Sequence, residues 1–598
     1  MTTEESMVTT TRLSLEDALL AFLKEKEVFD VVPVLEKSST MAFGDLSTNL
    51  ALVLAKRLGK PPFDIAEEIA SFLIQKDIVG IAEVSAMKPG FVNISFNAEF
   101  FASLISDIAR EGSAYGTNTT LAGEVWALEH TSPNPNKAMH LGHLRNNLVG
   151  MSVGHILEAS GASVIYEAID NNRGIAIAKL MWGFLAHMRK DETTPIDVAF
   201  WLEHKDLWYT PEERSMLPDL FVSECYVKGA EDCADPAIEE KVRGMVVSWE
   251  AEDAAVWALW SHMLSYSYEG MDRTLTRLGN RWDIVWHEHE HYKKGKEYVE
   301  KGLESGVFKK LEDGAVLTDL ASYNIPDTIL LKRDGTSLYI TQDLALTALK
   351  KKKHEADHLV WVIGPDQSLA MRQLFAVCEQ LGIGKLSDFT HVSYGYVGLK
   401  DGDGGFKKMS SREGTVVLID DVVDEVRDVL LKTVLDKEIE GVSMFALAEM
   451  LAIAAVKFSV LKAERTQDTA FDIEKSIETK GDSGIYVMYT YVRTQSILRK
   501  ARALGKNPKV GVFENGKEVA RHLLLYPQAV VRAREDLSVH HVAQYLLELS
   551  AAFNYWYNQE IILDGGVAEE HKLAVVEAVG TVLKNGFGLM GIKTVEEM

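Results

Sequence analysis

Two histidines, His140 and His143, stand three residues apart where a helix-like stretch begins. The apolar segment 125–128 precedes them and predicts a buried parallel strand, and the turn between is rich in Ser, Pro and Asn. A strand, a tight loop and a helix N-terminus bind phosphate well, because unpaired amides and the positive end of the helix dipole meet there. The spacing puts both imidazoles on one side of the first turn, and Gly142 leaves room for a nucleotide. Two ring N–H donors would suit a reaction in which negative charge grows on phosphate.

Two histidines at a helix start could also be structural, with their rings hydrogen-bonded only to the neighbouring backbone. A second segment of the chain favours the catalytic interpretation. Residues 407–417, KKMSSREGTVV, form a cationic loop after the Gly- and Asp-rich segment GLKDGDGG. Such a loop is suited to close over a triphosphate and to neutralise the leaving pyrophosphate. Together the two segments resemble the HIGH and KMSKS signatures of class I aminoacyl-tRNA synthetases.

The composition describes an ordinary soluble protein. Its 598 residues are enough for three or four domains, and 47% of them are hydrophobic against 25% charged. The first residues, MTTEESMVTTT, show neither the basic nor the apolar region of a signal peptide. The apolar segment MLAIAAVKFSVL is interrupted by Lys457, so we expect a buried helix rather than a membrane span. The three cysteines have no metal-ligand or paired spacing, so we expect a reduced, cytoplasmic protein.

The formal net charge of −25 argues only weakly against a nucleic-acid partner, since binding depends on local patches. The four lysines 350–353 are expected to form a solvated helix face. Tyrosines accompany a second cationic series between Arg493 and Lys509, and there we favour contact with RNA.

The order of predicted elements divides the chain into three regions. Residues 1–118 predict an α+β unit with three amphipathic helices and a strand pair around Lys88-Pro89-Gly90. Residues 119–435 alternate strands and helices, the pattern of a doubly wound, Rossmann-type α/β sheet, with a helical insertion at about 190–285. Residues 436–598 show helical patterns and no strands, which predicts an all-α bundle. His287–His291 alternates His and Glu, and this leaves a metal site open, although exposed polar alternation is commoner.

Two carboxylates mark a candidate amino-acid pocket. Glu129 ends the first strand of the sheet, and Asp343 follows segment 338–340, which we expect to be a later strand, as are 328–332 and 359–363. In a doubly wound sheet both positions face the crevice at the carboxyl edge. Two carboxylates suit a cationic side chain, and a guanidinium pairs bidentately in a way that an ammonium cannot. The alternative is that Asp343 merely caps a helix.

Over nearly its whole length the chain resembles the arginyl-tRNA synthetase family. The agreement lies in separate segments, SPN-x-x-K-x-x-H-x-G-H-x-R over 132–145, LY-x-T-x-D over 338–343, and H-x-SYG-x-V before the cationic loop. The N-terminal region carries the family's GD-x-x-x-N and PGF-[IV]-N segments. The resemblance implies an additional tRNA-binding domain at the N-terminus and an anticodon-binding domain in the C-terminal bundle.

The resemblance also implies the roles of individual residues. Arginine would be held by Glu129, Asn134, Tyr339, Asp343 and Gln367. ATP would be held by His140, Gly142, His143, Lys408, Met409 and Ser410, and the catalytic set would be His140, His143, Lys137 and Lys408.

The chain departs from the family pattern in three places. Ser411 replaces the second lysine of KMSKS, and the resemblance implies that Lys137 compensates for it. Residues 170–174, DNNRG, differ from the common N-D-x-G pattern, so their role in arginine contact stays open. Glu597 stands where the family's tail usually has Arg, which weakens the case for an anticodon contact there.

The predicted function is therefore that of an arginine–tRNA ligase. The carboxylate of arginine would attack the α-phosphorus of ATP, and the 3′-terminal adenosine of the tRNA would then accept the arginyl group. The attacking carboxylate is already ionised at neutral pH, so no side-chain base is needed. We expect Mg²⁺ on the phosphates, no protein-ligated metal, no membrane partner and a monomer. Two alternatives stay open: a nucleotidylyltransferase that binds no tRNA, and a synthetase-like binding module without aminoacylation.

Overall fold

The structure is a computed structural model that describes residues 6–38, 40–336, 338–400, 406–407, 417–433, 443–512, 516–566 and 568–598. The chain divides into two compact units. The first comprises Met1–Thr117, Glu478–Ala533 and His541–Met598, and the second comprises Asn118–Ile477 and Arg534–His540.

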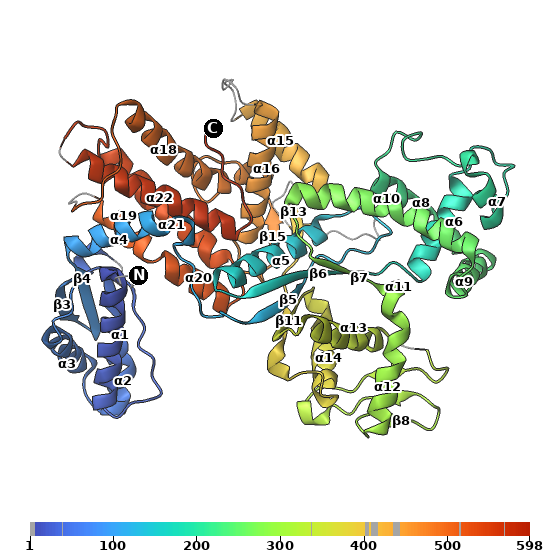
Figure 1. Ribbon diagram of the computed structural model, residues 1–598, viewed down its shortest axis with the longest axis horizontal. Helices are drawn as coiled ribbons and strands as arrows, with labels where there is room; N and C mark the ends of the chain where they lie inside the picture. Colours follow the sequence, from blue (N-terminus) through green and yellow to red (C-terminus); the bar gives the residue numbers. More distant parts are fainter. Residues whose placement is uncertain are drawn as a thin grey trace. The chain divides into compact units, whose positions relative to one another are not determined.

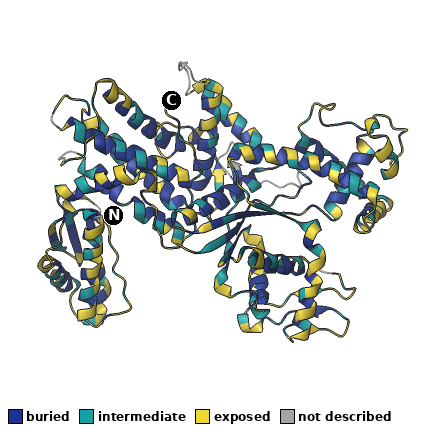
Figure 2. Cartoon of the chain, viewed as in Figure 1, coloured by how far each residue is buried: buried dark blue, intermediate teal, exposed yellow. Residues whose placement is uncertain are grey.

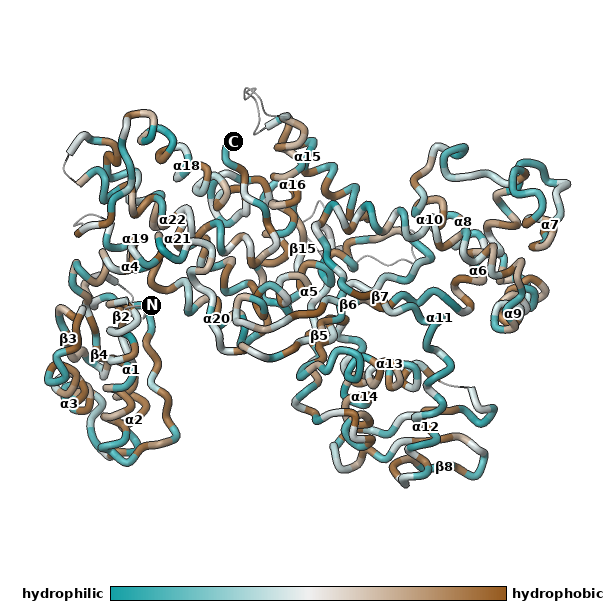
Figure 3. Tube along the Cα trace, viewed as in Figure 1, coloured by the Kyte–Doolittle hydropathy of each residue, from teal (hydrophilic) through white to brown (hydrophobic). Residues whose placement is uncertain are grey.

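A five-stranded parallel sheet lies at the centre of the second unit, with strand order β12-β11-β5-β6-β7. The strands are β5 (Val125–Glu129), β6 (Ser163–Asp170), β7 (Ile284–His287), β11 (His358–Val362) and β12 (Phe389–Val392). Apolar residues run through the sheet (brown near β5 in Figure 3), as in strands buried on both faces. Figure 1 shows α5 (Leu141–Ala159) on one side of the sheet, with α13 (Tyr339–His354) and α14 (Ser368–Gln380) on the other. This is the doubly wound arrangement that the sequence predicts.

A set of helices connects β6 to β7 and forms the insertion. These are α6 (Ile175–His187), α7 (Val198–Glu203), α8 (Pro218–Asp232), α9 (Pro236–Glu250) and α10 (Ala254–Leu278). They have a core of their own, in which Trp201 and Trp208 are fully buried. The short helix α9 carries many exposed residues (yellow in Figure 2) and buries a narrow stripe that includes Trp249.

Two of the strands expected in the central sheet lie elsewhere. Residues Ile329–Leu331 form β10, which pairs with β9 (Val316–Leu317) and through it with β8 (Lys309–Lys310) in a small antiparallel sheet. Residues 338–340 were expected to be a strand, but α13 begins at Tyr339. The apolar residues after Tyr339 continue with helical spacing and bury Ile340, Leu344 and Ala348, so the helical face outweighs the short apolar run. The short helices α11 (Glu288–His291) and α12 (Gly295–Glu304) connect β7 to this region.

The remainder of the second unit is a three-stranded sheet and a helical layer. The sheet contains β13 (Val397–Lys400), β14 (Phe406–Lys407) and β15 (Thr469–Phe471), so the expectation of no strands beyond residue 435 was wrong. The helices are α15 (Ile419–Thr433), α16 (Met444–Leu461) and α17 (Ile473–Ser476). By length and composition α16 could cross a membrane, but it is largely buried inside the unit and even Lys457 is buried. It is the core helix that the sequence predicts.

The first unit combines the N-terminal α+β region with the C-terminal helices. Its antiparallel sheet has the order β1-β2-β4-β3, built from β1 (Glu36–Lys37), β2 (Leu46–Thr48), β3 (Ile81–Met87) and β4 (Phe91–Phe96). Its N-terminal helices are α1 (Met7–Glu25), α2 (Leu50–Leu58), α3 (Pro62–Gln75) and α4 (Ala98–Glu111). The three amphipathic helices and the strand pair around Lys88-Pro89-Gly90 are confirmed. Its C-terminal helices are α18 (Gly484–Ala503), α19 (Lys517–Leu524), most of α20 (Tyr526–Glu535), α21 (His540–Gln559) and α22 (Glu569–Leu589).

Candidate active site

The histidine pair forms the N-terminus of α5. His140 is the residue that caps the helix, and its Nδ1 accepts a hydrogen bond from the Gly142 amide at 3.1 Å. The Nδ1 atom of His143 accepts from the His140 amide at 3.2 Å, and the two rings stack with centroids 4.0 Å apart. Because Nδ1 is the acceptor in each neutral ring, Nε2 carries the proton. The pair thus has two N–H donors, one on each stacked ring, at the start of the helix.

Both imidazoles are uncharged at neutral pH. Burial, with a smaller contribution from the Lys137 ammonium, lowers the pKa of His140 to about 4. Burial, His140 and Lys137 together lower the pKa of His143 well below its usual value. Burial also lowers the pKa of Lys137. Neutral rings can offer an anion hydrogen bonds but no charge, and the nearby positive charge comes from Lys137.

The cationic loop ends directly beside the histidines. Leu141 donates its amide hydrogen to the carbonyl of Val417 at 3.2 Å, and Ile419 donates to the carbonyl of Met139 at 3.2 Å. These bonds form an isolated antiparallel bridge between His140 and Leu418. Residues 408–410, with Lys408, Met409 and Ser410, lie outside the described residues. Of the loop's attachment to α5, the structure shows the C-terminal end, where Val417 bonds Leu141, the residue after the helix cap.

The two predicted carboxylates lie close to each other at the carboxyl edge of the sheet. Glu129 is the last residue of β5 and is buried, and Asp343 lies in the second turn of α13 and is half-buried. Burial, together with the negative charge of Glu129, raises the pKa of Asp343 to about 7. A carboxyl group with this pKa is poised to ionise when a cation arrives.

A buried lysine accompanies these carboxylates. Lys350 is only 2% exposed, and its Nζ lies 2.7 Å from Oε2 of Glu129. The expectation of a solvated face for all of 350–353 was therefore wrong for Lys350, although Lys352 and Lys353 are exposed.

The other residues assigned to arginine have exposed side chains. Tyr339 is 85% exposed at the first position of α13. The side chain of Gln367 donates to Asp366 at 2.9 Å, and Asn134 accepts from the Asn171 side chain at 3.2 Å. The structure brings Glu129 and Asp343 together, whereas Tyr339 and Gln367 face solvent.

A polar cluster one strand away joins two segments that the sequence analysis considered separately, 170–174 and 287–291. Asp170 ends β6 and is buried, and it accepts hydrogen bonds from His287 Nδ1 at 2.6 Å, Asn172 at 2.8 Å and the Tyr268 hydroxyl. This bond to Asp170 raises the pKa of His287. The sequence indicated the position of Asp170, since a turn after the carboxyl end of a central parallel strand faces the same crevice as Glu129, but it did not indicate the contacts with Tyr268 and His287. Within the described parts of the chain, no group of three or more His, Cys, Asp or Glu residues could hold a metal ion, and the His287–His291 series is part of this hydrogen-bond network.

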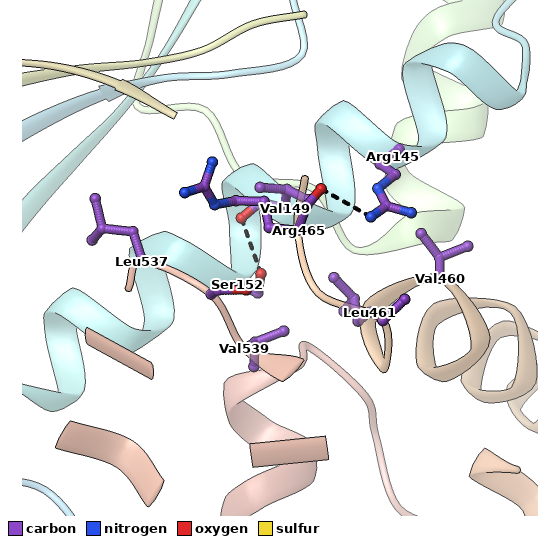
Figure 4. A pocket seen from close by; sticks show the side chains of 10 residues that line it. Arg145, Val149, Ser152, Val460, Leu461, Arg465, Leu537 and Val539 are labelled. Atoms are coloured by element: carbon purple, nitrogen blue, oxygen red, sulfur yellow. Dashed lines mark hydrogen bonds between the residues drawn. The ribbon is translucent and has the colours of Figure 1, made fainter. Parts of the chain in front are cut away.

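Arg145 on α5 forms hydrogen bonds with the segment before β15. It is 1% exposed, and its guanidinium donates to the carbonyls of residues 464, 465 and 467 and to the Thr469 hydroxyl, over 2.5–3.2 Å. Figure 4 shows Arg145 and Arg465 at a small pocket lined by α5 and by residues 537–539. Arg145 thus anchors α5 to residues 464–469.

Comparison with known proteins identifies the family. The family model described as "tRNA synthetases class I (R), catalytic domain" matches residues 105–473, which is more than half of the chain. The chain belongs to the arginyl-tRNA synthetases. The model of the arginyl-tRNA synthetase N-terminal domain matches residues 11–96, and that of the DALR anticodon binding domain matches residues 487–598. The prediction of an ATP-dependent arginine–tRNA ligase is confirmed, and the alternative of a nucleotidylyltransferase that binds no tRNA is wrong.

Individual relatives agree with this assignment. The chain is 34% identical over 576 residues to the arginine–tRNA ligase of Treponema denticola, covering 93% of each chain. It is 30% identical over 607 residues to that of Bacteroides thetaiotaomicron, covering 98% of this chain and all of the relative. Its fold is similar to that of the solved arginyl-tRNA synthetase of Thermus thermophilus, with a TM-score of 0.80 and 24% identity over 98% of this chain and 100% of the other. The corresponding structure from Plasmodium falciparum has a TM-score of 0.75 at 18% identity and covers 100% of both chains.

In this synthetase the GD segment of the N-terminal region has a structural role. Asp45 is 1% exposed, accepts a hydrogen bond from the Phe96 amide at 2.7 Å and pairs with Lys517 on α19 at 3.2 Å. Gly44 has a φ of +79°, and a Cβ there would come within 2.8 Å of the Ile94 carbonyl. The segment therefore holds the N-terminal sheet together and ties it to the C-terminal helices.

The cationic series on α18 is partly engaged within the protein. Arg493 bonds the side chain of Asn554 and lies over the rings of Tyr489 and Tyr557, 4.8 and 4.9 Å from their centroids. Arg499 pairs with Glu597 in the tail. The unusual acidic residue at position 597 thus has a partner within the protein.

Proposed function

We propose that Glu129 and Asp343 bind the guanidinium of the substrate arginine. The observation behind this proposal is the approach of the two carboxylates at the carboxyl edge of the sheet, where the charge of Glu129 helps to raise the pKa of Asp343. A planar guanidinium has N–H groups in several directions and can bond both carboxylates at once, whereas an ammonium acts as a compact point charge.

Three further residues, Asn134, Tyr339 and Gln367, would contact the substrate arginine. Asn134 lies on the loop after β5, and Gln367 follows β11, so both are near the same edge of the sheet. Tyr339 is exposed and can change its χ1 angle at little cost, so its ring can fold over the bound side chain. These roles are supported by position and by the family pattern.

ATP would bind across the start of α5. His140 and His143 would donate from Nε2 to the phosphates, Gly142 would allow close approach of the nucleotide, and Lys408, Met409 and Ser410 would close over it. Lys137 would stabilise the pyrophosphate in place of the lysine that Ser411 replaces. The arginine carboxylate then attacks the α-phosphorus and pyrophosphate leaves, so catalysis consists of positioning and charge stabilisation. Mg²⁺ would arrive with the ATP phosphates.

In the second step, the terminal ribose of the tRNA attacks the arginyl-adenylate and AMP leaves. We propose that the N-terminal region and the exposed part of the cationic series on α18 contact this tRNA. One chain carries the catalytic, N-terminal and anticodon-binding regions, which supports a monomer as the working form. The free cysteines among the described residues are consistent with the cytoplasm, where tRNA charging takes place.

The test is the Glu129→Gln variant in a tRNA charging assay. We expect the KM for arginine to rise about tenfold to a hundredfold, since a charge-assisted hydrogen bond is lost, while the KM for ATP stays the same. Glu124→Gln is a matched control, because Glu124 lies just before the opposite end of the same strand. An unchanged arginine KM in Glu129→Gln would remove this carboxylate from the pocket.

A further inference from the structure

Glu129 belongs to a buried ionic network that also contains Lys350 and Glu167. Glu129 on β5 and Glu167 on β6 are paired in register, so their side chains lie on the same face of the sheet. The ammonium of Lys350 lies between them, 2.7 Å from Oε2 of Glu129 and 3.1 Å from Oε2 of Glu167. Lys350 follows Asp343 by seven residues, which is two helical turns, so both side chains lie on the sheet-facing side of α13.

Both oxygens of the Glu167 carboxylate have polar partners. The other oxygen of Glu167, Oε1, accepts hydrogen bonds from His354 Nε2 at 2.6 Å and from the Trp286 indole at 2.7 Å. These partners and Lys350 outweigh the effect of burial and lower the pKa of Glu167 to about 2. Glu167 is therefore a permanent anion that faces the protein interior.

Lys350 lowers the negative charge of this network by half. With Lys350, the two glutamates and the lysine carry a net charge of −1, whereas the two glutamates alone would carry −2. Burial and the charge of Glu167 raise the pKa of Glu129, and the charge and hydrogen bond of Lys350 oppose this rise, so the loss of Lys350 would favour a proton on Glu129.

We propose that Lys350 is a positioning residue of the arginine pocket, whose buried ammonium fixes one oxygen of Glu129 and keeps this carboxylate charged for the incoming guanidinium. The proposal rests on the arginine pocket proposed above and deepens it. Lys350 itself does not contact the substrate. It makes Glu129 an ionised, immobile acceptor before arginine binds.

The titratable groups around the ammonium come from several elements. They are Glu129 on β5, Glu167 on β6, His354 and Asp343 on α13, and His291 and Glu288 on α11. Burial and the charge of Lys350 lower the pKa of His291 to about 4, so it stays neutral between pH 6 and 9. Asp343, with a pKa of about 7, changes its ionisation within this pH range in the parent.

The experiment compares Lys350→Met, whose side chain is similar in length but uncharged, with Lys352→Met, which alters an exposed lysine on the same helix. The KM values for arginine and ATP are measured by tRNA charging from pH 6 to 9. In Lys350→Met we expect the arginine KM to rise at least about tenfold at pH 7 and to keep falling above pH 8, because Glu129 now ionises late. The ATP KM should stay at the parent value, and Lys352→Met should match the parent throughout.

A second variant covers the case in which Lys350→Met does not fold. The double variant Lys350→Met/Glu167→Gln removes the lysine together with the carboxylate that shares it, so no pair of buried anions is left uncompensated. It should keep the raised arginine KM and the shift to higher pH. A folded variant of either kind with the parent's arginine KM and pH profile would overturn the proposal.

Comparing Glu129→Gln with Lys350→Met distinguishes a failure of the role proposed for Lys350 from a failure of the proposed arginine pocket. If Glu129→Gln raises the arginine KM but Lys350→Met does not, the pocket stands and the role of Lys350 is wrong. If Glu129→Gln also behaves like the parent, the pocket assignment itself is wrong.

Discussion

Lowering the pH from 8 to 6 should weaken the binding of arginine about tenfold, because only ionised Asp343 pairs with a guanidinium. Burial and the charge of Glu129 raise the pKa of Asp343 to about 7 in the free enzyme. Bound arginine brings a positive charge next to this group and lowers its pKa. Binding near and below neutral pH therefore releases a proton, and the affinity must rise with pH until Asp343 is fully ionised.

The size of the effect follows from the ionised fraction of Asp343. With a pKa of about 7, this fraction is about 9% at pH 6, about 50% at pH 7 and about 91% at pH 8. The apparent Kd is the intrinsic Kd divided by the competent fraction. The affinity for arginine should therefore rise about fivefold between pH 6 and 7 and about twofold between pH 7 and 8.

Calorimetric titration with arginine measures this directly. Repeating it in buffers with different ionisation enthalpies counts the protons released, about one half per arginine at pH 7. The Asp343→Asn variant should bind arginine weakly, with little pH dependence and no proton release. If the parent's affinity is constant from pH 6 to 8, or if the variant keeps the parent's slope, Asp343 is not the linked group and the reasoning fails.

Three further predictions concern the helix start and its support. His143→Ala should lower arginine-dependent ATP–pyrophosphate exchange about 100- to 1,000-fold, as expected for one lost transition-state donor, with a melting temperature close to the parent's; parent-like exchange would remove His143 from the catalytic set. Lys137→Ala should reduce this exchange more than Lys408→Met does, and normal exchange in Lys137→Ala would show that it does not compensate for the missing loop lysine. Arg145→Met should destabilise the second unit by at least about 3 kcal/mol, since it leaves several buried oxygens without their charged donor, and a parent-like thermal unfolding curve would contradict this.

Features that depend on local sequence were predictable. The apolar strand, the polar turn and the helix start around His140 follow each other within 35 residues, and neighbouring residues decide all three. The position of Glu129 at the carboxyl end of that strand was predictable for the same reason, whereas its role as an arginine ligand stays a prediction.

Features that depend on distant contacts were not predictable. Lys350 belongs to a run of four lysines, and only the packing of α13 on the sheet distinguishes the buried one from its solvated neighbours. The same packing makes 338–340 the start of a helix, where a short apolar run is ambiguous. Asp170 gained its significance from Tyr268 and His287, about a hundred residues away along the chain.

The recognition of a guanidinium by Glu129 and Asp343 is tested most directly by steady-state tRNA charging with the parent and Asp343→Asn, at varied arginine and ATP and with lysine as a competing substrate. We expect the variant's KM for arginine to rise about tenfold or more, because the amide keeps at most one hydrogen bond and loses the charge-assisted component. Its KM for ATP should stay at the parent value, and lysine should be a poor substrate of the parent, since an ammonium leaves buried acceptors unpaired. An unchanged KM for arginine, or a change confined to ATP, would place Asp343 outside the pocket and contradict this recognition.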